Sequence, residues 1–169
     1  MIWLTLIGGT YIVTLLEIAL AQTLDVHHAT PCWLALWAIV WVASHRASQW
    51  NILAAGAIGL IFDLNSGSHL GVGVLAFGAA GFAIERLGVR FRRLDPLLRA
   101  LATTPLVLLV MLLVFAGNRI VGEPVPPITL AVSRAVMIAA YTAAVSLPVW
   151  MCSGWLREPS QARLGRLSF

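Results

Sequence analysis

The sequence has few charged residues and no lysine. Of its 169 residues only 11% are charged and 60% are hydrophobic, with a mean hydropathy of +0.90. An average soluble domain carries about 25% charged residues. A water-soluble fold cannot hide this much apolar surface, because its own surface must still be covered. The scarcity of charge therefore excludes an ordinary soluble domain and predicts an integral membrane protein.

Several motifs are also missing from the sequence. It contains no P-loop, no zinc-type spacing and no low-complexity tail, and we expect no cofactor and no metal. Its two cysteines, Cys32 and Cys152, fall in different predicted spans near opposite faces, so we expect no disulfide between them. All eleven basic residues are arginines, and the net charge is +4. In a soluble protein this balance would suggest nucleic acid. Here the arginines cluster beside hydrophobic segments, so we interpret them as topology signals and expect no nucleic-acid partner.

Hydrophobic segments account for most of the chain. A membrane span needs roughly 20 apolar residues. The second and third segments are shorter than this, so they either cross a locally thinned bilayer or form a re-entrant hairpin. We predict an all-α, polytopic bundle of six transmembrane helices, forming a single domain over residues 1–156 with a short polar tail over 157–169. The predicted segments are residues 2–24, 31–44, 50–64, 70–87, 100–120 and 128–155.

The distribution of arginines predicts the orientation. Nine of the eleven lie after the second segment, after the fourth segment or in the tail. Arginine-rich loops stay in the cytoplasm, so we expect a multi-pass membrane protein with both termini on the cytoplasmic side. The basic loop predicted after the fourth segment would face anionic lipid headgroups or a cytoplasmic partner. Its arginines are Arg86, Arg90, Arg92, Arg93 and Arg99.

One polar stretch interrupts the hydrophobic pattern. Between Gly59 and Gly73 the chain places Asp63, Asn65, two serines and a histidine within seven residues. A hydrolase or an outer metal site is the less favoured interpretation, because neighbours in one tight loop cannot readily converge on a nucleophile. We instead expect a turn, with Ser68 or Asn65 capping the start of the fourth helix.

Three charges are predicted within the outer half of the membrane: Glu17, Asp63 and Arg134. Charged groups in a span normally face protein or water. Arg134 could therefore pair with Glu17 or Asp63, either as a structural ion pair or as the lining of an outward pocket. Small residues in the third, fourth and sixth segments, and a tryptophan stripe in the second, favour packing within the bundle, with a partner's helix as the alternative.

The central stretch resembles the signature of the bacterial rod shape-determining protein MreD family. That family has a Gly-Leu-x-x-Asp pattern followed by a Ser-Gly-rich turn and Leu-Gly. The matching residues are Gly59, Leu60, Asp63, Ser66, Gly67, Leu70 and Gly71.

The resemblance implies a non-enzymatic scaffold of the cell-elongation complex in the bacterial inner membrane. Such a protein would bind the single-span protein MreC and help position a peptidoglycan glycosyltransferase and transpeptidase. The family is also similar in fold to the substrate-binding subunits of energy-coupling-factor transporters. A vitamin-type transporter subunit is therefore the alternative function.

Overall fold

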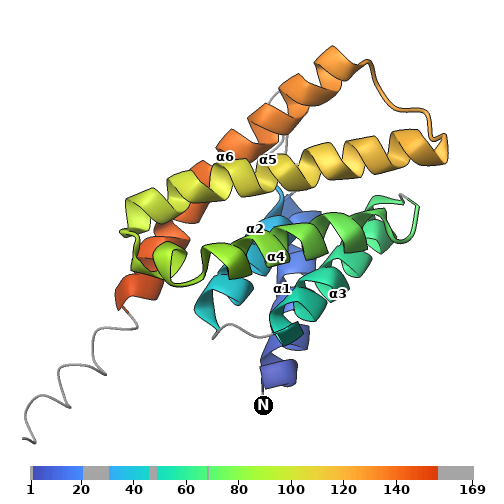
Figure 1. Ribbon diagram of the computed structural model, residues 1–169. Coiled ribbons are helices and arrows are strands. Elements are labelled where there is room, and N and C mark those ends of the chain that lie inside the picture. Colours follow the sequence, from blue (N-terminus) through green and yellow to red (C-terminus); the bar gives the residue numbers. More distant parts are fainter. Residues whose placement is uncertain (1, 21–30, 46–48, 68, 156–169) are drawn as a thin grey trace, which may run out of the picture.

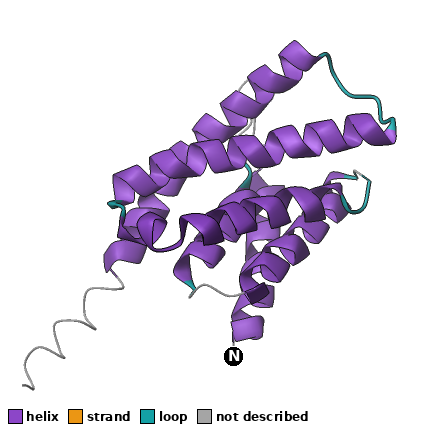
Figure 2. Ribbon diagram, viewed as in Figure 1, coloured by secondary structure: helices purple, strands orange, loops and turns teal. Residues whose placement is uncertain are grey.

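The computed structural model describes residues 2–20, 31–45, 49–67 and 69–155, and these form six helices and no strand (Figures 1 and 2). The predicted tail over 157–169 lies outside the described residues, as do Asp25, His27, His28, Arg46 and Ser68. All six helices coincide with predicted segments. They are α1 (Ile2–Leu20), α2 (Trp33–Ser44), α3 (Gln49–Ser66), α4 (Val72–Arg93), α5 (Pro96–Val121) and α6 (Ile128–Trp155).

The fourth helix is longer than the sequence suggested. We predicted a basic loop after residue 87, but Arg86, Arg90, Arg92 and Arg93 all belong to α4. Arginine is a good helix former, and buried Phe91 continues the inward-facing pattern, so nothing stops the helix there. The helix ends before Asp95-Pro96, where proline disfavours helical geometry in the residue before it. Pro96 then begins α5, and Arg99 lies in its first turn.

The short helix α2 lies at the centre of the bundle. Eight of its twelve residues are buried, and α1, α3 and α4 all pack against it. The long helices α5 and α6 form a hairpin beside α4 and diverge towards their connecting loop (Figure 1). Protein therefore surrounds most of this short helix.

Two helices are long and apolar enough to cross a membrane by themselves, at Pro96–Val121 and Ile128–Cys152. Two others are apolar but shorter, at Trp3–Ala19 and Trp33–Ser44. Helices α3 and α4 are long enough, at 18 and 22 residues, but glycines and charges lower their hydropathy. The prediction of six spans therefore remains a prediction for the other four helices.

Two tryptophans of the predicted stripe on α2, Trp37 and Trp41, pack against other residues of the protein. Trp37 donates a hydrogen bond from Nε1 to Oγ1 of Thr10 on α1 (3.1 Å), and its ring lies where a side chain on Gly9 would be. Trp41 is buried and stacks beside His45, with ring centroids 4.1 Å apart. The Trp37 contacts dock α1 onto α2, as expected for packing within the bundle.

Candidate functional site

The motif glycines allow α3 and α4 to pack in close contact. Gly59 faces Gly73 across the helix pair, and a Cβ atom added to Gly59 would collide with the carbonyl oxygen of Gly73. One and two turns further along α4, Phe77 and Gly81 continue this seam, with Gly81 against Ala55. The small residues predicted in the third segment, which include Ala55 and Gly59, thus form a packing face within the protein, as is usual where helices associate in lipid.

Asp63 fastens this helix pair at one end. Its side chain is 1% exposed, and its two carboxylate oxygens accept the backbone N–H groups of Gly71 (2.8 Å) and Gly73 (2.7 Å). The first amides of a helix have no partner within it, and the N-terminus carries a partial positive charge. A carboxylate at the end of α3 therefore satisfies and stabilises the start of α4. Asp63 thus caps α4, a role that we predicted for Ser68 or Asn65; Ser68 lies outside the described residues.

The connection between α3 and α4 starts two residues later than the predicted segments placed it. Helix α3 continues through Asn65 and Ser66, and α4 begins at Val72. Asn65 is exposed, and the Ser66 hydroxyl donates to the Phe62 carbonyl of its own helix (2.8 Å). Leu70 is 66% exposed at the tip of the bundle. The structure thus separates Asp63, which faces α4, from the exposed neighbours that we grouped with it.

Two glycines of the turn have backbone conformations that other residues rarely adopt. Gly67 has φ of 65° and Gly71 has φ of 108°. A Cβ atom added at either position would meet nothing within 4 Å, so the requirement for glycine comes from the backbone alone. These two motif positions define the geometry that brings Asp63 to the start of α4.

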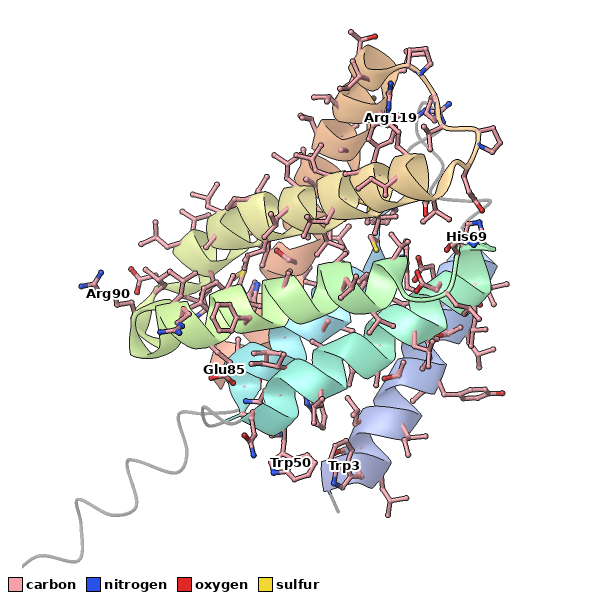
Figure 3. All side chains as sticks on the ribbon, turned by 45° about the vertical axis from the view of Figure 1, so that its right-hand side comes forward. Trp3, Trp50, His69, Glu85, Arg90 and Arg119 are labelled. Atoms are coloured by element: carbon pink, nitrogen blue, oxygen red, sulfur yellow. The ribbon has the colours of Figure 1, made fainter. Side chains whose placement is uncertain are left out.

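A second loop lies against this turn. The Nε2 atom of His69 is 3.4 Å from a carboxylate oxygen of Glu123, in the loop between α5 and α6. Figure 3 shows His69 and Arg119 at this end of the bundle, away from Trp3, Trp50 and Glu85. The predicted six spans with cytoplasmic termini put three loops on the outer side, and the two of them that follow the third and fifth segments therefore meet at one end. His69 contacts Glu123 here, and no nucleophile and base are brought together in the described turn.

Glu17 performs a similar capping role for another helix. Its Oε2 atom accepts the backbone N–H of Leu34, the second residue of α2, at 3.3 Å. Arg134 is exposed on α6. Among the described residues, Arg134 forms no ion pair with Glu17 or Asp63. The structure does not bring together the three charges that we expected to pair or to line a pocket.

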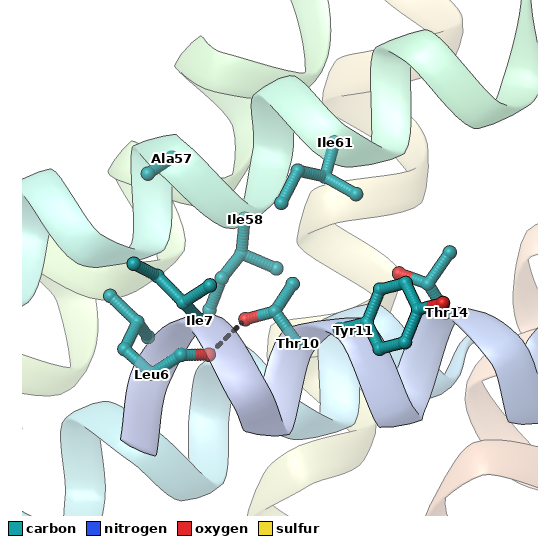
Figure 4. Close-up of a pocket in the computed structure, with 8 residues that line it drawn as sticks. All are labelled: Leu6, Ile7, Thr10, Tyr11, Thr14, Ala57, Ile58 and Ile61. Atoms are coloured by element: carbon teal, nitrogen blue, oxygen red, sulfur yellow. Dashed lines mark hydrogen bonds between the residues drawn. The ribbon is translucent and has the colours of Figure 1, made fainter. Parts of the chain in front are cut away.

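The principal cavities are apolar grooves between helices. One of about 270 Å³ separates α1 from α3 (Figure 4), where the Thr10 hydroxyl donates to the Leu6 carbonyl at 2.7 Å. A larger groove of about 530 Å³ lies between α4 and α5. None of Glu17, Asp63 and Arg134 lines either groove. The first groove is lined by Leu6, Ile7, Thr10, Tyr11, Thr14, Ala57, Ile58 and Ile61.

Two partnerships were missed in the sequence. Gly73 lies ten residues after Asp63, and its two neighbours in space are the Asp63 carboxylate and the Gly59 carbonyl. The signal was present as Gly71-Val72-Gly73, since a second glycine at a helix start allows close backbone approach. The other pair is Asn51 and Glu85, whose side chains are hydrogen-bonded at 2.6 Å near the opposite end of α3 and α4.

These features define a class of protein: an all-helical membrane protein whose polar motif joins two of its helices through a buried carboxylate. The family model described as rod shape-determining protein MreD matches residues 1–153. The chain belongs to this family of membrane proteins and has a role in rod shape determination. No curated protein and no solved structure matches the chain.

Proposed function

We propose that this chain is a non-enzymatic scaffold of the cell-elongation complex in the bacterial inner membrane. It would bind the single-span protein MreC and thereby help position the peptidoglycan glycosyltransferase and transpeptidase of that complex. The observation that carries this proposal is the family match, which includes the whole Asp63 motif. Asp63, the only acidic residue of the motif, is buried, and its carboxylate accepts two backbone N–H groups. This carboxylate therefore stabilises the fold, which supports a structural role for the motif.

The same proposal includes six membrane crossings with both termini in the cytoplasm. The end carrying residues 67–71 and 122–127 has Arg119 as its nearest arginine, whereas five arginines lie between residues 85 and 99 at the other end of α4. This asymmetry supports an outward-facing Asp63 turn. Helix α2 spans only about 18 Å. Its position inside the bundle supports a crossing in which neighbouring helices, and not lipid, surround it.

Co-purification in a mild detergent tests the scaffold proposal. We expect a single-span membrane protein to remain bound to the purified chain, and we expect added vitamins to leave the unfolding temperature unchanged. The opposite result, a tightly bound metabolite without a single-span partner, would favour the transporter alternative. Among the described residues Glu17 accepts the Leu34 N–H and forms no ion pair with Arg134, which favours the scaffold over the transporter alternative.

A further inference from the structure

We infer that one end of the bundle, defined by Trp3, Trp50, Arg86 and Arg90, is a binding surface for the headgroups of anionic phospholipids. This inference does not depend on the scaffold proposal. The lipid bilayer supplies the negative charge that these side chains bind. We call these four residues the basic end.

Two contacts place the elements of the basic end at one level. The rings of Trp3 on α1 and Trp50 on α3 meet edge to face, with centroids 6.1 Å apart. Directly after Trp50, the Asn51 amide donates to the Glu85 carboxylate of α4 at 2.6 Å. The start of α1, the start of α3 and residue 85 of α4 therefore lie side by side. Figure 3 shows Trp3, Trp50 and Glu85 together at this end.

The two tryptophans are unusually exposed for their size. Trp3 is 51% and Trp50 is 58% exposed, although each has a neighbouring ring to pack on. Tryptophan is enriched where a membrane meets water, because its ring is apolar and its N–H is polar. An exposed pair at one level of the bundle marks the height of the lipid headgroups on the protein.

Helix α4 carries positive charge from this level outward. Phe82, Arg86 and Arg90 are spaced by four residues, so they share one face, and all three are exposed. The guanidinium carbon of Arg86 lies 4.9 Å from the centre of the Phe82 ring. This stripe changes from aromatic to basic along its length, as a helix face does when it leaves the hydrocarbon region for the headgroups. Arg90 projects away from the bundle in Figure 3.

The acidic residues at this end do not cancel the stripe. Between residues 85 and 99 the chain has five arginines and two carboxylates, a net charge of +3. Glu85 is turned towards Asn51 of α3, and Asp95 occupies the N-cap position of α5. The exposed face of α4 is therefore basic, and its charge is complementary to anionic phospholipid.

The test reconstitutes the full chain into bilayers of phosphatidylglycerol and phosphatidylcholine in equal parts. The protein is extracted in mild detergent, and the two retained lipids are quantified. We expect enrichment of phosphatidylglycerol with the wild type, decreasing at higher salt. In the double variant Arg86→Gln/Arg90→Gln the enrichment of phosphatidylglycerol should fall by about tenfold. Two of the positive charges that attract the anionic lipid are then missing.

A matched control removes the same charge from elsewhere. Arg119→Gln/Arg134→Gln also loses two exposed arginines, but outside the basic end, and should retain the enrichment. Arg86→Lys/Arg90→Lys keeps the charge and should also retain it. Equal loss in both glutamine variants, or no loss in either, would overturn the inference. So would a variant at Arg86 and Arg90 that keeps its lipid enrichment but loses a cytoplasmic protein, since the surface would then serve that protein.

Discussion

At the scale of single residues, Asp63 is the side chain on which the motif's geometry depends. Asp63→Ala leaves the N–H groups of Gly71 and Gly73 without acceptors at a buried helix start. Hydrogen bonds to charged groups contribute about 1.5–3 kcal/mol each, so the loss of two should lower the free energy of unfolding by about 3–6 kcal/mol. Thermal or denaturant unfolding in detergent measures this loss.

Two further variants distinguish a cap from a general effect of mutation near the turn. Asp63→Asn keeps one acceptor oxygen but turns an amide donor towards the second N–H, so its loss of stability should be intermediate. The exposed neighbour Asn65→Ala should change stability by less than about 0.5 kcal/mol. A loss in Asn65→Ala equal to that in Asp63→Ala would contradict the capping role.

Gly73 and Gly78 offer a matched comparison on the same helix. A Cβ atom at Gly73 would collide with the Asp63 carboxylate and the Gly59 carbonyl, whereas one at Gly78 would meet nothing within 4 Å. Gly73→Ala should therefore destabilise by about 1–3 kcal/mol, as overpacking does. Gly78→Ala should be neutral or stabilising, because alanine favours helix. If the unfolding curves of Gly73→Ala and Gly78→Ala coincide, α3 and α4 do not pack as described.

At the scale of elements, the two glycines of the turn joining α3 and α4 should differ in how well they tolerate substitution. Gly67 lies in the left-handed region that asparagine also visits, whereas Gly71, with φ of 108°, lies outside it. Gly67→Asn should be mild, while Gly71→Asn and valine at either position should lower the unfolding temperature. If Gly71→Asn is as stable as Gly67→Asn, the turn has another conformation.

The sequence predicted the existence of these elements better than their contacts. Asp63 and the turn were identified because a carboxylate is rare in so apolar a chain, and glycines clustered around it. The backbone N–H groups that Asp63 binds were not predicted. Which side chains face α4 depends on the continuation of α3 through Ser66, and the predicted segment ended two residues earlier. Asn65 and Ser66 thereby become exposed, and only Asp63 remains on the buried face. Such a choice depends on helix phase, which a pattern of polar residues does not define.

The arginines after residue 85 show a related difficulty. We interpreted these arginines as a cytoplasmic loop, because arginine-rich loops mark the cytoplasmic side. Arginine also favours helix, and Phe91 is buried, so α4 continues to Arg93. The expected pairing of Glu17 with Arg134 failed for a physical reason as well. A backbone N–H at the start of α2 already serves as the partner of Glu17. In a membrane protein, unpaired helix amides compete with charged side chains for each carboxylate.

At the scale of the whole molecule, the proposed orientation predicts which residues are reachable from each side. With exposed Cys152 replaced by serine, and Cys32 buried, single cysteines report on accessibility. In intact cells a membrane-impermeant maleimide should label Asn65→Cys but not Arg90→Cys, because α4 carries the chain across. Labelling of Arg90→Cys alone would invert the topology, and labelling of both would mean that α4 does not cross.

The central claim is that the Asp63-capped helix pair shapes a surface that captures a single-span partner. Its most direct measurement is the amount of partner retained per folded chain after purification. Val107→Ala, at a fully buried position on α5, provides a destabilised control away from the helix pair. We expect Val107→Ala to retain the partner and Asp63→Ala to lose it by about tenfold, a difference of 1.4 kcal/mol in binding. Full retention by Asp63→Ala, or equal loss in both variants, would contradict the claim.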